Sequence, residues 1–284
     1  MPELPEVEVT RRGLEGSLQG ATVTGVIIRN SRLRWPVDAE LPHSLRHARL
    51  ARIDRRGKYL LMRWDMGTDM GTDMGKGQRA GTLIVHLGMS GSLRIVPPDQ
   101  APDRHDHVEL VFGNRCLRLR DPRRFGAMLW ATGPAEQHPL LAHLGIEPLS
   151  DEFDGAWLYR ALRERTAPVK SLLMNNRLIV GVGNIYAAES LFRSGVRPGT
   201  PGKRLGPARA DRLARAVRET LEDAIALGGS SLRDYLHSDG GAGCFQLTTM
   251  VYGRAGEPCR LCGTPILVQR QAQRSTYYCP DCQK

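Results

Sequence analysis

Residues 259–282 read CRLCGTPILVQRQAQRSTYYCPDC and contain two Cys-x-x-Cys pairs separated by sixteen residues. Each pair bends the chain so that two thiolates face one ion, and tetrahedral Zn²⁺ takes four ligands. We predict one structural zinc with no position open to water, held by Cys259, Cys262, Cys279 and Cys282. Disulfides are the alternative, which an intracellular location disfavours. Cys116 and Cys244 are expected to be free thiols.

The sixteen residues between the pairs form two β-rich runs joined by a polar turn. This pattern predicts a hairpin finger, with Arg274 just past its turn. Arg254, Arg270 and Arg274 are the finger's candidate phosphate contacts. A finger used only for contacts with proteins is the alternative.

Two kinds of pattern divide the rest of the chain. Residues 21–132 are rich in Val, Ile, Leu and aromatics, with breaks at Gly, Pro and Asp, which predicts a β-sandwich or barrel. A helical pattern follows from about residue 150, with its longest run over 208–228. The predicted fold class is therefore α+β. We place the domains at 1–133 (β), 150–250 (helical) and 251–284 (the cysteine-rich module).

The segment DMGTDMGTDMGKG, residues 65–77, repeats a four-residue unit. Because it is rich in Gly and has no apolar periodicity, we predict a flexible loop inserted between two strands. A Met-rich binding patch is the less favoured alternative.

Two further stretches carry local signals. The start, MPELPEVEVTRRGLE, predicts a helix from about Pro5, with acidic residues beside the positive helix end. In LIVGVGNIYAAESLF (178–192), Gly181 and Gly183 permit a tight turn, and Asn184 is predicted to cap a helix over 185–194. The free N–H groups of such a helix start would suit a phosphate, although Gly-Asn before a helix is more often only a cap.

Composition points to a nucleic-acid partner. The 284 residues carry a formal net charge of +10, with a sequence pI of about 9.7. Such a charge favours an acidic partner, and a basic solvated surface is the alternative. The sequence contains no apolar run of 18 residues, and its first twenty residues resemble no secretion signal. We therefore expect a cytoplasmic protein with no membrane partner.

Six motifs together closely resemble the bacterial formamidopyrimidine-DNA glycosylases. They are MPELPEVE (1–8), RRGKYLL (55–61), HLGMSGSLR (86–94), DPRRFG (121–126), GVGNIYAAESLF (181–192) and QRSTYYCPDCQK (273–284). The resemblance spans nearly the whole chain. It implies a β-sandwich flanked by helices, a helix–two-turn–helix domain and a zinc hairpin. It also implies a monomeric enzyme of the bacterial cytoplasm, associated with the nucleoid, that removes 8-oxoguanine and ring-opened purines from duplex DNA.

The resemblance assigns catalytic roles to four residues. Once Met1 is removed, Pro2 becomes a secondary amine that attacks C1′ of the damaged nucleotide and forms an imine. An α-amino group titrates near pH 7.7–8.0, so part of it is unprotonated at neutral pH. Glu3 corresponds to the acid that protonates the sugar-ring oxygen, Lys58 to the lysine that assists β-elimination, and Arg274 to the arginine of phosphate contact and δ-elimination.

Further roles concern DNA. A base inside a duplex must be flipped out before it is excised, and the gap must be filled. Met89, Arg123 and Phe125 match the family's gap-filling residues. The residues that the resemblance implies for DNA binding are His105, Arg123, Arg124, Arg165, Lys170 and Asn184.

One departure from the family concerns the loop HSDGGAGCF (237–245), which often closes over the flipped base. Family members commonly have a lysine and an aromatic residue there, whereas this chain has Gly241 and Cys244. Two other functions remain open. One is an endonuclease VIII-type glycosylase for oxidised pyrimidines, and the other is a noncatalytic zinc-finger DNA-binding protein. The latter would have no need of Pro2, Glu3 and Lys58.

Overall fold

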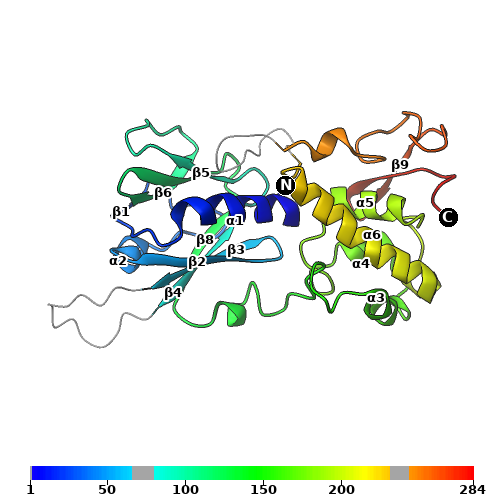
Figure 1. The fold of residues 1–284 in the computed structure, drawn as a ribbon, viewed down its shortest axis with the longest axis horizontal. Coiled ribbons are helices and arrows are strands. Elements are labelled where there is room, and N and C mark those ends of the chain that lie inside the picture. The colour runs from blue at the N-terminus through cyan, green and yellow to red at the C-terminus, as the bar shows by residue number, and fades with distance from the viewer. Residues whose placement is uncertain (1, 66–79, 231–242) are drawn as a thin grey trace. The chain divides into compact units, whose positions relative to one another are not determined.

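The computed structural model describes residues 2–65, 80–230 and 243–284 (Figure 1). The chain divides into two compact units. Unit 1 contains the described parts of residues 1–2, 6–142 and 230–243, and unit 2 contains residues 3–5, 143–229 and 244–284.

Unit 1 is built on two antiparallel four-stranded sheets. One sheet has the order β1-β6-β7-β5, with β1 Gly25–Ile28, β6 Asp106–Phe112, β7 Arg115–Arg120 and β5 Ser92–Val96. The other has the order β2-β3-β4-β8, with β2 Arg49–Arg56, β3 Tyr59–Asp65, β4 Gly81–His86 and β8 Ala127–Ala131. Their apolar side chains form one core, as in a β-sandwich.

Helices flank this sandwich. Helix α1, Leu4–Leu18, contributes Val7, Leu14 and Leu18 to the core between the sheets. Their spacing of seven and four residues places them on one face of the helix. The short helix α2, Leu41–Leu45, adds Leu41 and Leu45 to the same core, and a 3₁₀ turn, η1, covers Ala135–Gln137.

Unit 2 is helical apart from its last strands. Its elements are α3 Gly155–Leu162, α4 Val169–Leu173, α5 Asn184–Arg193, η2 Gly202–Arg204, α6 Pro207–Ala226 and η3 Phe245–Leu247. Helix α6 buries Leu213, Val217 and Leu221 in the core of this unit, together with residues of α3 and α5. The start of the chain joins this core through Leu4.

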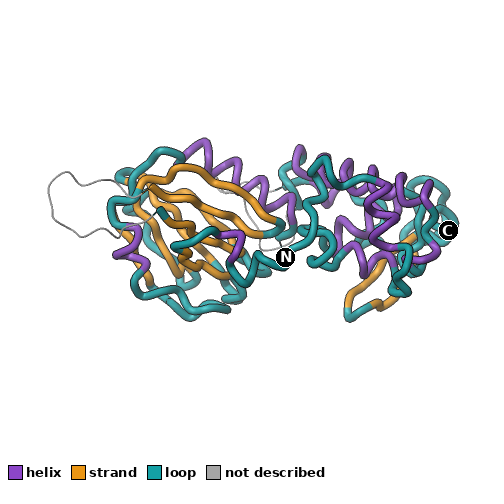
Figure 2. The backbone as a smooth tube through the Cα atoms, turned by 90° about the horizontal axis from the view of Figure 1, so that it is seen from below, coloured by secondary structure: helices purple, strands orange, loops and turns teal. Residues whose placement is uncertain are grey.

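The C-terminal hairpin pairs β9, Leu267–Gln271, with β10, Arg274–Tyr278 (Figure 2). Its two-residue turn consists of Ala272 and Gln273, both with left-handed backbone (φ 47° and 64°). Two-residue hairpin turns of this kind are usually made by Asn-Gly, because non-glycine residues pay about 1–2 kcal/mol each in this region. Arg274 follows the turn directly, as predicted.

The α+β class and the order of strands, helices and hairpin are confirmed. Strand β2 lies inside the predicted β region but has no strand pattern of its own, because five of its eight residues are charged and only Leu50 and Ile53 are buried. The repeat at 65–77 lies outside the described residues except for Asp65. Of the loop 237–245, only residues 243–245 are described, and Gly241 is not among them.

We predict that deleting residues 66–74 leaves the sandwich and its chemistry intact. Strands β3 and β4 pair from Tyr59↔His86 to Trp64↔Gly81, so the deletion removes chain only from their connection. Seven residues would remain between Trp64 and Gly81, enough for a hairpin connection. Thermal unfolding and excision from an 8-oxoguanine duplex should match those of the full chain. A deleted protein that folds with bound zinc but has lost excision would contradict this.

Candidate functional site

Glu3 lies in a cradle made by the loop before α5. Its side chain is only 3% exposed, and its Oε1 accepts a hydrogen bond from the backbone N–H of Ile185 at 3.3 Å. A Cβ atom at Gly183 would lie 2.2 Å from the Glu3 carboxylate, so only glycine fits there. Gly181 accepts the backbone N–H of Leu4 at 3.1 Å and has a φ of 81°. The two glycines of GVGN therefore shape the loop around the start of the chain.

This arrangement corrects the prediction for Asn184. Asn184 is the first residue of α5, Gly183 is the N-cap residue, and no side chain caps the helix from that position. The N–H of Ile185, in the first turn of α5, is directed to Glu3. The prediction failed because the partner is 182 residues away in sequence. The side chain of Asn184 instead donates from Nδ2 to the carbonyl of Ser275 at 3.1 Å.

Lys170 lies under the finger hairpin and shares this carbonyl. Its Nζ donates to Ser275 O at 3.2 Å and to Thr276 Oγ1 at 2.7 Å, and its side chain is buried. Burial lowers the pKa of Lys170 from 10.5 to about 8. The charge of Arg274 also lowers this pKa, whereas the charge of Glu3 raises it. A cavity of about 120 Å³ is lined by Lys170, Arg274, Ser171, Met174, Gln271 and Ala272. Lys170, Asn184 and Arg274 thus form one polar cluster.

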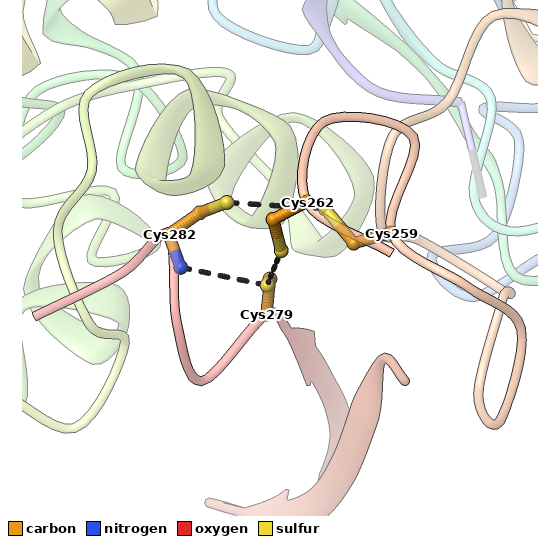
Figure 3. A group of neighbouring side chains, drawn as sticks. All are labelled: Cys259, Cys262, Cys279 and Cys282. Carbon is orange, nitrogen blue, oxygen red and sulfur yellow. Dashed lines mark hydrogen bonds between the residues drawn. The ribbon is translucent and has the colours of Figure 1, made fainter. Parts of the chain in front are cut away.

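The four cysteines of the finger converge on one point (Figure 3). Their Sγ atoms all lie within 4.8 Å of one another, with 3.4 Å between Cys262 and Cys279 and 3.9 Å between Cys259 and Cys282. Four thiolates about 2.3 Å from a central Zn²⁺ would place their sulfurs about 3.8 Å apart, so this donor set fits one structural zinc. Cys116 is a free, buried thiol, as predicted.

The finger is anchored to α5. The buried carboxylate of Glu189 accepts three backbone N–H groups, from Met250 at 2.8 Å, Val251 at 3.0 Å and Tyr252 at 2.8 Å. Burial raises the pKa of Glu189 in spite of these hydrogen bonds. A small core also contains Ala188, Phe192, Val251, Cys259, Ile266 and Cys279. Helix α5 therefore positions Asn184 at its start and the zinc module along its side.

Lys58 occupies the two-residue turn between β2 and β3. Gly57, at the first position of this turn, has a φ of 57°, which glycine adopts readily. Arg55 donates to the Gly57 carbonyl at 3.1 Å and to the Glu8 carboxylate of α1 at 3.2 Å. Although burial opposes it, hydrogen bonds from Arg11 and Arg12 lower the pKa of Glu8. The ionised Glu8 and Arg55 thus support the turn that carries Lys58.

His86 lies beside this turn, with its ring centroid 4.8 Å from that of Tyr59. Its Nδ1 accepts the backbone N–H of Gly88 at 3.0 Å. Burial, followed by the charges of Lys58 and Arg34, lowers the pKa of His86 from 6.5 to about 4. At neutral pH the imidazole is therefore uncharged.

The predicted gap-filling residues lie on two loops that are joined to each other. Met89 and Phe125 are 39% and 44% exposed, unusual for large apolar side chains, and the Arg123 guanidinium lies 4.9 Å from the Phe125 ring centroid. The fully buried Asp121 accepts Ser90 Oγ at 3.1 Å and the N–H of Gly126 at 2.8 Å. The motifs HLGMSG and DPRRFG therefore form a single exposed tip.

Ser90 and Asp121 were not predicted as site residues, because only side chains that could contact DNA were considered in these two motifs. Ser90 Oγ also accepts the N–H of Arg123 at 3.3 Å. The available signal was a serine and an aspartate within the same two motifs as the tip residues.

The remaining residues that were predicted to contact DNA belong to both units. His105 is half-buried, and its carbonyl accepts the N–H of Asp121 at 3.0 Å. Arg124 is exposed, with a left-handed φ of 56°. Both therefore lie next to the tip in unit 1. Arg165 is exposed in unit 2, where its Nε donates to the Ala161 carbonyl. Pro2 is buried and belongs to unit 1, two residues before the first residue of α1.

Three parts of the chain match known protein families. Residues 1–128 match the formamidopyrimidine-DNA glycosylase N-terminal domain, and residues 144–235 match the H2TH domain of the same enzymes. Residues 256–284 match the zinc finger found in FPG and IleRS. None of the helices in the described ranges has the length and apolarity needed to span a bilayer. The fold and the four-thiolate site define a zinc-containing DNA glycosylase of base-excision repair.

Individual relatives agree over the whole length. The chain is 53% identical to the formamidopyrimidine-DNA glycosylase of Bordetella petrii and 54% identical to that of Dechloromonas aromatica, in both cases over 100% of each protein. It matches the MutM (Fpg) protein of Thermus thermophilus at a TM-score of 0.84, with 40% identity, over 99% of this chain and 98% of that one. A Lactococcus lactis FPG mutant bound to Fapy-dG DNA matches over 100% of both chains, with a TM-score of 0.87 and 32% identity. The chain belongs to the formamidopyrimidine-DNA glycosylase family.

We predict that Gly183→Ala abolishes most base excision without unfolding the protein. The new Cβ would push the Glu3 carboxylate away, and a displacement of about 1 Å at a catalytic group costs on the order of 10²-fold in rate. Gly183 has a φ of −120°, which alanine tolerates. The matched control is Gly206→Ala, where nothing lies within 4 Å of the new Cβ. Equal single-turnover excision by both variants, with normal zinc content, would refute the cradle.

The lowered pKa of His86 predicts how the free energy of unfolding depends on pH. Because its pKa is lowered to about 4 in the fold and is near 6.5 in the unfolded chain, the unfolded state binds the extra proton between these values. The contribution of His86 to the free energy of unfolding therefore falls as the pH drops from about 6.5 to 4, and levels off below. His86→Asn should flatten this dependence in urea unfolding from pH 7 to 4. Parallel curves for both proteins would contradict the assignment.

Proposed function

We propose that this protein excises oxidised purines, 8-oxoguanine and formamidopyrimidines, from duplex DNA through an imine at Pro2. It then cleaves the abasic strand by β,δ-elimination, so that glycosylase and AP lyase act at one site. Membership of the family supports this activity. Solved Lactococcus lactis relatives are bound to abasic-site DNA and to Fapy-dG DNA.

The observation that carries the proposal is the cradle around Glu3. Glu3 is 3% exposed, and a main-chain N–H together with a glycine that has no room for a side chain holds its carboxylate in one position. Glu3 follows Pro2 directly in the chain. Fixing Glu3 therefore restrains the neighbouring nucleophile, and both act on the same sugar.

The nucleophile requires processing of the chain. While Met1 is present, the Pro2 nitrogen is a tertiary amide and has no free electron pair for attack. Removal of Met1 makes it a secondary amine, which attacks C1′ as the damaged base leaves, while Glu3 protonates the ring oxygen. The sugar opens to the iminium intermediate. Lys58 then assists β-elimination, and Arg274 binds phosphate and assists δ-elimination.

The exposed tip prepares the substrate. Met89, Arg123 and Phe125 would enter the duplex and replace the stacking and pairing of the flipped base. Six residues would hold phosphates: His105, Arg123, Arg124, Arg165, Lys170 and Asn184. For Lys170, a phosphate entering the cavity beside Arg274 would favour the charged ammonium, whose pKa is about 8.

The zinc serves the finger and takes no part in the chemistry. When bound, it neutralises the clustered thiolates and fixes the fold of the hairpin that carries Arg274. We assign catalysis to the β-sandwich domain, residues 1–133, and DNA binding to the helix–two-turn–helix domain, residues 150–250. The zinc finger comprises residues 251–284. We further propose that the protein acts as a monomer in the bacterial cytoplasm, associated with the nucleoid through DNA.

Borohydride trapping tests the central step. The Met1-processed protein is mixed with an 8-oxoguanine:C duplex, borohydride is added, and the adduct is mapped by mass spectrometry. We expect one covalent link, at Pro2. Glu3→Gln should lower base excision by about 10²–10⁴-fold, because it removes a positioned acid. The control is Glu15→Gln, a surface position on α1, which should excise normally.

Folded, zinc-loaded protein that lacks Met1 and forms no adduct would reject the imine at this lesion. A thymine-glycol duplex in the same assay then separates two outcomes. An adduct only on that substrate would assign the enzyme to oxidised pyrimidines, the preference of the endonuclease VIII type. This arm is warranted because a Lactococcus lactis relative has been solved with oxidised-pyrimidine DNA. No adduct on either substrate would indicate a protein that binds DNA without excising bases.

A further inference from the structure

A recess of about 400 Å³ in unit 2 has no role in the site described above. It is lined by Arg197, Gly199, Thr200, Pro201, Arg204, Arg209 and Gln269. Three of these seven residues are arginines and none is acidic, so the recess carries a local charge of +3. It lies where the loop 197–201, the start of α6 and strand β9 meet.

These arginines have no Asp or Glu partner in the part of the chain that the structure describes. Among the described residues, no Asp or Glu side chain lies within 4 Å of the guanidinium nitrogens of Arg197, Arg204 or Arg209. Other arginines of unit 2 are neutralised, for example Arg193 by Asp223 at 2.7 Å and Arg215 by Asp211 at 2.9 Å. Like charges gathered in one recess repel one another, and a bound anion offsets that repulsion.

Two of the three guanidinium groups are held in place. Arg197 donates to the Tyr278 hydroxyl at 3.4 Å, and its guanidinium lies 5.3 Å from the centroid of that ring. Arg209 donates to the carbonyl of Lys284. Arg204 is exposed, and its side chain makes no hydrogen bond or ion pair with the described residues. Planar guanidinium groups that are already held in place lose little side-chain entropy when their N–H groups bind the oxygens of a phosphate.

The recess adjoins the cluster of Lys170 and Arg274. Gln269 lines the recess and Gln271 lines the small cavity beside Arg274. They are two residues apart on β9, a distance of about 7 Å along the same side of the strand. The loop 197–201 is also bonded to α4, because Pro198 O accepts the N–H of Lys170 and Thr200 O accepts that of Val169. The basic groups therefore continue from one cavity to the next.

We propose that this recess binds phosphates of the DNA backbone outside the lesion, extending the contact made at Lys170 and Arg274. This inference rests on the DNA binding of the proposed function. The phosphates of a duplex form a continuous line of charge, so a second basic cavity next to the first suits the same backbone. A small polyphosphate offers the same chemistry but would not need this continuity.

The test measures binding of undamaged duplex DNA to the full, zinc-loaded chain as a function of salt. Undamaged DNA makes the result independent of Pro2 chemistry, so it is separate from any failure of base excision. Arg204→Gln should lower the slope of log K against log salt concentration by about 1, and Arg197→Gln/Arg204→Gln by about 2. Arg160→Gln, which removes one exposed charge from α3 outside the recess, should leave the slope unchanged.

Three results would overturn the proposal. Identical slopes for all variants would show that the recess makes no phosphate contact. An equal decrease for Arg160→Gln would show that only bulk charge matters. The third result requires calorimetry with tripolyphosphate. If Arg204→Gln loses tripolyphosphate binding while its DNA slope stays unchanged, the recess is a site for small polyphosphates.

Discussion

The contact between the Glu3 carboxylate and the first turn of α5 is the constraint on which the rest of the structure depends. It ties the third residue of the chain to the middle of unit 2, through a hydrogen bond of 3.3 Å and a glycine with no free space. Helix α5 also carries Asn184 and, through Glu189, the segment 250–252 that leads into the finger. One helix thus fixes the candidate acid, a candidate phosphate contact and the base of the zinc module.

Unit 2 buries two ionisable side chains, Glu189 and Lys170, and their burial has different consequences. Glu189 is expensive to bury, yet its three main-chain partners make it a rigid joint between helix and finger. Lys170 is buried against two acceptors of β10, which leaves its ammonium poorly solvated. Such a group gains more from a phosphate than a solvated lysine would, because part of the desolvation has already taken place during folding.

Much of the architecture could be predicted from the sequence, because spacing rules are local. The Cys-x-x-Cys pairs, the hairpin between them and the end of α6 before Gly228 all follow from such rules. Strand β2 has no strand pattern of its own because tertiary packing, rather than its charged sequence, makes it a strand. The prediction of Asn184 as a cap was wrong because the actual partner of the helix start, Glu3, is 182 residues away in sequence. Two other contacts could not be predicted for the same reason: the support of Lys58 by Arg55 and Glu8, and the hydrogen bond between Ser90 and Asp121. Contacts between residues that are distant in sequence leave no local pattern.

The turn Ala272–Gln273 has a consequence for protein engineering. Both residues adopt a backbone conformation that Asn-Gly would adopt at lower cost, so a screen for thermal stability would be expected to replace this dipeptide early. The replacement would remove the Gln273 side chain, which accepts a hydrogen bond from Arg270 at 2.7 Å immediately before Arg274. A more heat-resistant variant obtained in this way would carry an altered fingertip. The backbone strain of the turn and the position of the Arg270 side chain therefore depend on the same two residues.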